Sequence, residues 1–219
     1  MTLEDSVRLG RGGSGEFNFT PDEQRIFSEG VEAVTVSQAA GLLEVYDFSR
    51  HRRILDVAGG TGTFLKSILE RYPVAEGTLF ELPQAAAVAR TKLRGTPLER
   101  RIRIVEGDFF KDPLPKDHDA LIVANVVHVL DHAQNERLFH HMRACATPGA
   151  RLLLVDFWTN VAHTEPLFAA LMAGEFLVTA GNGDVYSVDE GKMWLAQSGW
   201  HFLEHKSVAG PGSLLLAAV

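Results

Sequence analysis

Residues 53–62 read RILDVAGGTG, a short apolar run followed by three closely spaced glycines. The apolar run is typical of a buried β-strand, and a helical pattern over Thr63–Tyr72 follows it directly. Glycine allows backbone turns that a β-carbon disfavours, and it lets the chain approach a ligand closely. A glycine-rich loop between a strand and a helix therefore predicts a cofactor site, with a tight turn that binds nothing as the alternative.

Further strand and helix patterns alternate along the chain. Strands are predicted in GTLFEL, RIRIVEGD, DALIVANVV and RLLLVDF, at 77–82, 101–108, 119–127 and 151–157. Helices are predicted at Gln84–Arg94, Gln134–Ala146 and Val188–Ser198. This alternation predicts an α/β protein with a mostly parallel sheet that helices cover on both faces. Near the C-terminus, WHFLEHKSV and SLLLAAV flank a Gly-Pro-Gly turn so short that these two strands must be antiparallel.

The N-terminal part of the chain has a different pattern. Its first twenty residues are polar and rich in glycine, which predicts a loop or arm. The following Thr20-Pro21-Asp22-Glu23 is typical of a helix start, with Thr20 as the N-cap and Pro21 at the first helical position. We therefore expect an arm with one or two helices over 1–46 and a single α/β domain over 47–219.

The composition argues against several classes of partner. The formal net charge is −7 and Lys and Arg do not cluster, so nucleic acid or an anionic membrane surface would be repelled. Cys145 is the single cysteine, which rules out an internal disulfide, and His140 and His141 lack carboxylates at metal-ligand spacing. We therefore expect no metal site. Because we find neither a signal-peptide pattern nor an apolar run of membrane-spanning length, we expect a cytoplasmic enzyme.

An acidic residue follows the glycine loop at an informative distance. Glu81 ends the next predicted strand, nineteen positions after Gly62. A carboxylate about twenty residues after such a loop is placed to hold a pair of ribose hydroxyls, which suits NAD and S-adenosylmethionine (SAM) alike. Phe64 and Leu65 follow where the dinucleotide pattern needs a third glycine. SAM carries no pyrophosphate and does not require that glycine.

Six short motifs follow one another along the chain. They are DVAGGTG at 56–62, ELP at 81–83, GDFF at 107–110, VHVLD at 127–131, PGARLLLVD at 148–156 and the stretch from Ser187 to Trp200. Together they resemble the plant-type small-molecule O-methyltransferase family and its bacterial relatives. The family's motifs are D-V-G-G-G-T-G, D-L-P, G-D-x-F, L-H-D-W, P-G-G-x-x-L-x-x-E, and a Ser or Thr followed by a helix and A-G-F. The resemblance implies the Rossmann-like class I methyltransferase fold, with a seven-stranded mixed sheet that ends in an antiparallel hairpin.

The resemblance also implies roles for individual residues. It places at the SAM cofactor the loop and strand-end residues Ala58, Gly59, Gly60, Gly62, Glu81, Leu82, Asp108, Phe109 and Asn125. Glu81 would hold the ribose hydroxyls, and Asp108 and Phe109 would frame the adenine. His128 would act as the general base, and Asp156 would orient it. The alternatives are a turn-capping role for Asp108 and a purely core role for His128.

The chemistry supports a histidine base. A phenol is a poor nucleophile while it is protonated, and an imidazole with a pKa of about 6.5 accepts its proton at neutral pH. A carboxylate on the other ring nitrogen fixes the tautomer and stabilises the imidazolium. His128 and Asp156 each follow an apolar strand, so we expect both at the carboxyl edge of the sheet, where open α/β sheets bind ligands.

The chain departs from the family at several positions. Ala58 replaces the first motif glycine, Ala124 stands where relatives usually carry Lys or Arg, and Leu130 replaces a tryptophan. Only a remnant of the relatives' dimerisation domain is expected in 1–46, so a homodimer or a partner chain would complete the pocket. The implied function is SAM-dependent O-methylation of a small aromatic or polyketide-like hydroxyl. The alternatives are a SAM-binding member with non-methyl chemistry (hydroxylation, decarboxylation or cyclisation) and a non-catalytic cofactor-binding subunit.

Overall fold

The computed structural model describes residues 3–9, 12, 19–181 and 183–219. The helices are α1 (Leu3–Leu9), α2 (Pro21–Val45), α3 (Thr63–Arg71), α4 (Pro83–Leu93), the short 3-10 helix η1 (Val127–Val129), α5 (His132–Cys145), α6 (Leu167–Ala180) and α7 (Val188–Gln197). The strands are β1 (Arg53–Val57), β2 (Glu76–Glu81), β3 (Ile102–Glu106), β4 (His118–Ala124), β5 (Ala146–Asp156), β6 (His201–Ser207) and β7 (Ser213–Ala218). These bounds confirm the strands and helices predicted from Arg53 onward, with shifted ends. The largest shift is at the start of β5, which begins at Ala146 and not at Arg151. Ala146 already pairs with His118, ahead of an irregularity in the pairing of β4 with β5.

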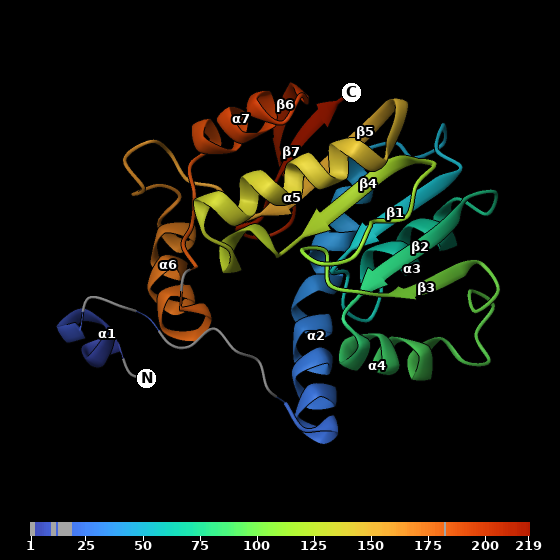
Figure 1. Cartoon of the computed structure of the whole chain (residues 1–219), viewed down its shortest axis with the longest axis horizontal. Helices are drawn as coiled ribbons and strands as arrows, with labels where there is room; N and C mark the ends of the chain where they lie inside the picture. Colours follow the sequence, from blue (N-terminus) through green and yellow to red (C-terminus); the bar gives the residue numbers. More distant parts are fainter. Residues whose placement is uncertain (1–2, 10–11, 13–18, 182) are drawn as a thin grey trace.

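The strands form one seven-stranded sheet in the order β3-β2-β1-β4-β5-β7-β6 (Figure 1). All neighbours from β3 to β5 are parallel, and β7 runs antiparallel to both β5 and β6. The strand order reverses between β1 and β4, and open α/β sheets bind ligands at the carboxyl ends of the strands beside such a reversal. The topology confirms the Rossmann-like class I methyltransferase fold with a C-terminal antiparallel hairpin.

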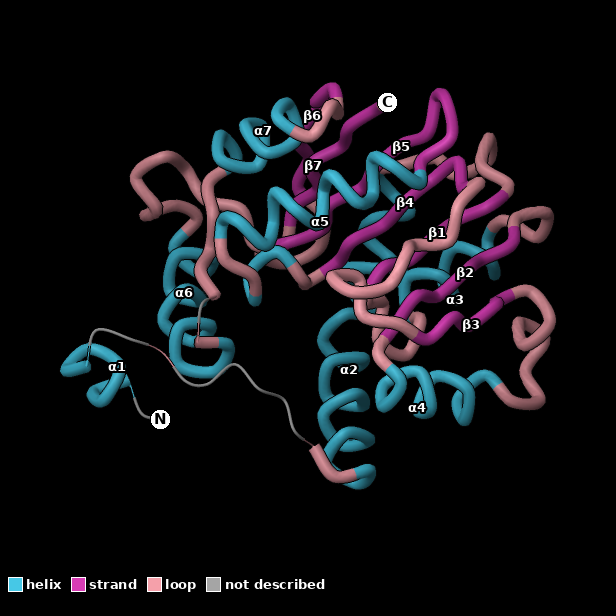
Figure 2. The backbone as a smooth tube through the Cα atoms, in the orientation of Figure 1, coloured by secondary structure: helices cyan, strands magenta, loops and turns pink. Residues whose placement is uncertain are grey.

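Alternate side chains of the central strands enter two separate cores. Leu55 and Val123 join the core that includes residues of α5 and α7. Ile54 and Ile122, one position away in each strand, join the core formed with α2, α3 and α4. Helices therefore lie on both faces of the sheet, as Figure 2 shows. Because both faces of the central strands pack into apolar cores, the polar side chains of the predicted site lie at the strand ends and in the loops that follow them.

α2 is one continuous helix that is tied to the α/β core. It begins as predicted, with a capping box in which Thr20 accepts the Glu23 N–H and the Glu23 carboxylate accepts the Thr20 N–H. Glu32 on α2 forms ion pairs with Lys66 on α3 and Lys92 on α4. The domain boundary predicted just after this helix stays a prediction. Among the described helices, none combines the length and apolar content needed to cross a membrane.

Two helices lie where the sequence predicted none. The loop or arm predicted for the first twenty residues is wrong at Leu3–Leu9, which form α1. Residues 1–2, 10–11 and 13–18 lie outside the described residues. α6 reads LFAALMAGEFLVTA, which is apolar on nearly every side, so it lacks the polar face that makes helical periodicity visible. α1 contacts α6 (Figure 1). Gly12 packs so closely on the end of α6 that a Cβ there would lie 2.1 Å from the Leu177 oxygen.

Candidate functional site

The loop after β1 has the backbone conformation that its glycines predict. Gly60 and Gly62 have φ values of 60° and 78°, in the left-handed region. Ala58 has a φ of 57°, a conformation that costs an L-residue other than glycine on the order of 1 kcal/mol. Ala58 therefore occupies a position that favours the glycine of the family motif. A Cβ at Gly60 would meet no atom of the described residues within 4 Å, so this part of the chain leaves open space beside the loop.

Glu81, at the end of β2, lies directly beside this loop. Its carboxylate accepts the Gly60 N–H at 2.8 Å and the Leu82 N–H at 2.7 Å. The side chain is 7% exposed, and burial raises its pKa despite these two hydrogen bonds. The structure thus brings the predicted ribose carboxylate and the predicted loop together. Leu82 contributes its N–H, while its side chain is largely exposed.

Asp56 is a residue of the site that sequence reasoning missed. It lies on β1 beneath the loop, wholly buried, and neither carboxyl oxygen has a hydrogen-bond partner among the described residues. Burial, followed by the nearby charge of Glu81, raises the pKa of Asp56 to about 7. A Cβ at Gly59 would lie 2.4 Å from the Asp56 carboxyl carbon, so this contact requires glycine. The available signal was the aspartate that begins DVAGGTG.

Asp108 and Phe109 follow β3 at the same edge of the sheet. The Asp108 carboxylate accepts the Phe110 N–H at 2.8 Å and pairs with Lys111 at 2.9 Å. Burial alone would raise the pKa of Asp108, but the hydrogen bonds from Lys111 and the Phe110 N–H lower it overall. Asp108 thus makes the local contacts of a turn-capping residue, and these contacts do not decide between that role and a cofactor role. The roles of Asp108 and Phe109 towards adenine stay predictions.

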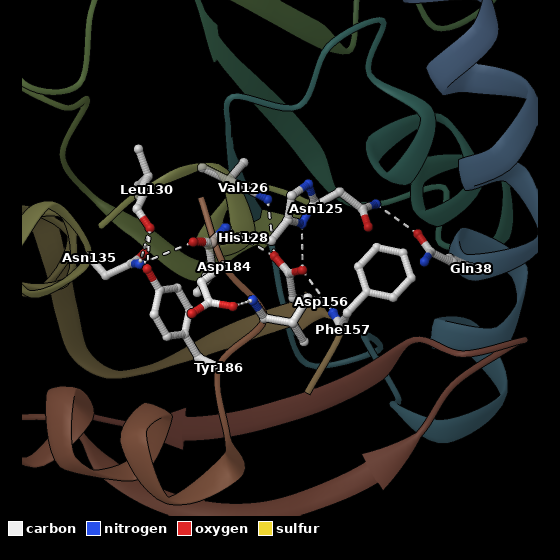
Figure 3. Close-up of polar contacts among 12 residues, drawn as sticks. Gln38, Asn125, Val126, His128, Leu130, Asn135, Asp156, Phe157, Asp184 and Tyr186 are labelled. Carbon is white, nitrogen blue, oxygen red and sulfur yellow. Dashed lines mark hydrogen bonds and ion pairs between the residues drawn. The ribbon is translucent and has the colours of Figure 1, made fainter. Parts of the chain in front are cut away.

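Asn125 connects the end of β4 to α2. Its φ is 58°, its N–H donates to the Val155 oxygen at 2.9 Å, and its side-chain amide donates to Gln38 at 2.7 Å (Figure 3). Gln38 is 7% exposed and lies 87 positions earlier in the chain. Sequence reasoning missed Gln38 because no local pattern connects a helix residue to a strand end so far away.

His128 and Asp156 meet as predicted. The Nδ1 atom of His128 lies 2.7 Å from Oδ1 of Asp156, and both side chains are buried (Figure 3). His128 is held in η1 just after β4, and Asp156 ends β5, the next strand in the sheet. The pairing leaves Nε2 on the side of the imidazole that faces away from Asp156. This arrangement suits a base that accepts a proton at Nε2 and is held by a carboxylate at Nδ1.

The Asp156 carboxylate also organises the backbone around His128. Its Oδ2 accepts the Val126 N–H at 3.1 Å and the Val127 N–H at 2.9 Å, and its Oδ1 also accepts the Phe157 N–H at 2.8 Å. Three backbone donors and one imidazole therefore converge on a single buried carboxylate. Such a network fixes the turn that carries His128.

Neighbouring polar groups complete that turn. Asp131 is the N-cap of α5 and accepts the Gln134 N–H at 2.8 Å. Asn135 donates to the Val127 oxygen at 3.0 Å, and Tyr186 donates to the Leu130 oxygen at 2.5 Å (Figure 3). These hydrogen bonds support the turn that carries His128.

A surface cavity of about 680 Å³ lies elsewhere, beside α7 and β6. It is lined by Trp158, Lys192 and His205, among others, and by none of the predicted site residues. In the described ranges, no group of three or more His, Cys, Asp or Glu side chains is placed to hold a metal ion. The predicted site residues lie along the edge formed by the carboxyl ends of β1, β2, β3, β4 and β5, and this edge is the candidate site.

Comparison with known proteins agrees with this geometry. The profile of the O-methyltransferase domain family matches residues 9–201. The 3-hydroxy-5-methyl-1-naphthoate 3-O-methyltransferase of Streptomyces sahachiroi is 30% identical over 85% of this chain and 54% of its own length. The mitomycin biosynthesis 6-O-methyltransferase of Streptomyces lavendulae is 27% identical over 99% of this chain and 63% of its own length.

A solved methyltransferase structure shares the fold of this chain. Human N-acetylserotonin methyltransferase in complex with SAM superposes with a TM-score of 0.89 at 26% identity, covering 99% of this chain and 65% of the human chain. This chain thus spans between half and two thirds of the length of these relatives. With the family profile matched over most of its residues and with the fold shared, the chain belongs to the O-methyltransferase domain family.

Proposed function

We propose that this chain transfers a methyl group from SAM to a hydroxyl of a small aromatic or polyketide-like acceptor, with His128 as the general base. The observation that carries the proposal is the buried His128–Asp156 pair, which lies at the same sheet edge as the glycine loop and Glu81. Relatives named as a naphthoate 3-O-methyltransferase and as a mitomycin biosynthesis 6-O-methyltransferase support the acceptor class. The human neighbour solved with SAM supports the cofactor.

The residues present fit SAM. The described residues leave open space beside the loop at Gly60. Glu81 offers a carboxylate at the sequence separation from Gly62 that is typical of a residue holding ribose hydroxyls. The Asp56 carboxyl beneath the loop has no partner among the described residues, and a ligand or an ordered water would satisfy it. Gly59, Gly60, Gly62 and Glu81 would hold the cofactor, with Ala58, Leu82, Asp108, Phe109 and Asn125 around it. When bound, SAM supplies a methyl group that is already activated by its positive sulfur.

The chain's own residues then have three tasks. They bind and align the two substrates, they exclude water, and they remove one proton. His128 would take the acceptor proton at Nε2 as the acceptor oxygen replaces the sulfur on the methyl carbon, so that the C–S bond breaks while the C–O bond forms. Asp156 holds Nδ1, so the ring keeps the tautomer with a free Nε2 and the resulting imidazolium is stabilised.

The first experiment combines a cofactor titration with a turnover assay. Calorimetry should show binding of SAM and no binding of NAD. Turnover of methyl-labelled SAM with a panel of phenolic and polyketide acceptors should yield one S-adenosylhomocysteine per methylated product. Product formed without S-adenosylhomocysteine would favour the non-methyl alternative. SAM binding without turnover by the purified chain would favour a non-catalytic subunit.

The second experiment tests the base. His128→Ala should lower turnover of a non-acidic phenol by about 10²- to 10⁴-fold while the affinity for SAM stays nearly unchanged. His140→Ala is the matched control, because His140 is an exposed histidine on α5 whose contact is an ion pair with Glu136. Wild-type turnover by His128→Ala across the pH range would remove His128 from the mechanism. Asp156→Asn is a poor test, since an amide NH₂ would face the backbone donors that the carboxylate now accepts.

We further propose that the active form is a homodimer or contains a partner chain that completes the pocket. Large apolar side chains are exposed on α1, α2 and α6, including Val7 at 74%, Val34 at 71% and Leu167 at 69%. Contiguous apolar surface of several hundred Å² is uncommon on a monomer. Light scattering should therefore show self-association, or else a monomer that lacks full activity without its partner chain. A monomer at high concentration with full activity would contradict this.

A further inference from the structure

The C-terminal half of α6 covers His128. The ring of Phe176 stacks on the imidazole with centroids 3.7 Å apart and planes inclined by 18°. Phe157 meets the same imidazole edge-on, at 5.6 Å and 61°. The segment that follows α6 holds the backbone as well, because the Asp184 N–H donates to the His128 oxygen at 3.0 Å. α6 and its C-terminal extension thus contact both the ring and the main chain of the proposed base.

The hydrogen bond to Asp156 does not by itself determine the plane of the imidazole. The χ2 torsion of histidine has broad minima, so the ring can rotate about Cβ–Cγ over a wide range. Because Nδ1 lies off the Cβ–Cγ axis, its contact with Asp156 narrows this rotation, but a hydrogen bond tolerates an N–H···O angle down to about 120–150°, so the ring can still tilt and displace Nε2. A flat ring stacked on one face restricts that rotation, because tilting the imidazole would drive it into the neighbouring aromatic ring.

Phe176 is itself held firmly. It is 8% exposed and belongs to a small core with Ala169 and Val185. A Cβ at Gly183 would lie 2.3 Å from the His128 oxygen and 3.3 Å from Cβ of Phe176, so the backbone of this segment is closely packed against both residues. Phe176 carries no donor or acceptor, and any effect on proton transfer must act through His128.

We propose that Phe176 is a positioning residue for His128. Its ring fixes the imidazole plane so that Nε2 is aimed at the acceptor hydroxyl. The inference rests on the proposed role of His128 as base, and it gives α6 a part in catalysis that no motif of the sequence indicates. It predicts an effect on the proton-transfer step and none on the binding of SAM.

The first test compares two acceptors in Phe176→Leu and Phe176→Met, which keep an apolar side chain but lose the flat face. For a non-acidic phenol, kcat should fall about 10- to 100-fold, because a misplaced catalytic group loses rate on that scale. For a nitro-substituted phenol that is already ionised at the assay pH, no base is needed, and kcat should change by less than about threefold. Phe176→Tyr restores the flat ring and should restore most of kcat.

The matched control is Phe168→Leu, on the same helix. Phe168 is 56% exposed and its ring lies 6.4 Å from that of Phe157. It should leave kcat for both acceptors close to that of the wild type. Equal losses for the ionised and the non-ionised phenol in the Phe176 variants would overturn the proposal, since they would mean that Phe176 binds the acceptor or merely supports the fold. Wild-type kcat in these variants would overturn it too.

The second test needs no turnover. The ring current of a stacked phenyl group shifts the proton resonances of the imidazole upfield, so His128 in the wild-type chain should show displaced ring-proton signals, assigned with His128→Ala. Phe176→Leu or Phe176→Met, in a form that retains its thermal unfolding transition, should return these signals towards the values of an unstacked histidine. Unchanged signals would refute the stacking. If the wild type methylated no acceptor, the proposed function would fail, while the ring-current result would still report on the geometry.

Discussion

Asp56 offers a quantitative test of the electrostatics beneath the glycine loop. It is wholly buried without a hydrogen-bond partner among the described residues, and its pKa is raised from an ordinary value of 3.8 to about 7. The folded chain therefore binds a proton that the unfolded chain releases. Stability linked to Asp56 is fully present below the unfolded pKa and is lost as pH rises towards and through the folded pKa.

The magnitude follows from the shift. The folded pKa of Asp56 lies about two pH units above pH 5, and each pH unit changes the free energy of unfolding by about 1.4 kcal/mol. Raising the pH from about 5 to about 8 should therefore lower the free energy of unfolding by roughly 3 kcal/mol. Asp56→Asn places a neutral side chain of similar shape there and should lose most of this pH dependence. The buried Glu81, whose pKa is also raised, leaves a residual slope of the same sign.

The assay is urea unfolding at about pH 5 and about pH 8. For the wild type the midpoint should fall by about 1 M urea across this range, and for Asp56→Asn by clearly less. The comparison uses the pH dependence because the buried amide has its own cost at every pH. Glu76→Gln, which alters an exposed carboxyl at the start of β2, is the control and should behave as the wild type. An equal pH dependence in wild type and Asp56→Asn would refute the reasoning.

Two further predictions concern the same loop. Glu81→Ala should weaken SAM binding by about 1–3 kcal/mol, measured by calorimetry, because charge-assisted hydrogen bonds to a buried group are lost; unchanged affinity would rule out the ribose role. Gly59→Ala should destabilise the chain by about 1–3 kcal/mol in thermal unfolding, because its Cβ would collide with the Asp56 carboxyl. Gly30→Ala, in α2 with open space around it, should instead stabilise by roughly 1 kcal/mol; the same sign for both glycines would contradict the contact argument.

Local patterns in the sequence were sufficient for the sheet and for much of the site. Apolar runs alternating with helical patterns predicted the parallel strands, and the short turn at 210–212 required an antiparallel hairpin. Because parallel strands place their carboxyl ends at one edge, the positions of Glu81, His128 and Asp156 after strands were enough to predict where they lie. The contact between His128 and Asp156 follows from the adjacency of β4 and β5.

Only the tertiary structure decided which side chains on separate elements touch. No periodicity in the local sequence links those elements. α6 was missed because a helix that is apolar on nearly every side has no distinct polar face, and its Phe176 reaches His128 from 48 positions away in the chain. Gln38 reaches Asn125 from α2, and Asp56 becomes a buried carboxyl with a raised pKa once helices cover the sheet. A sequence pattern determines which face of a strand or helix is apolar. The distance between two side chains on separate elements depends on how those faces pack, and only the folded chain determines that distance.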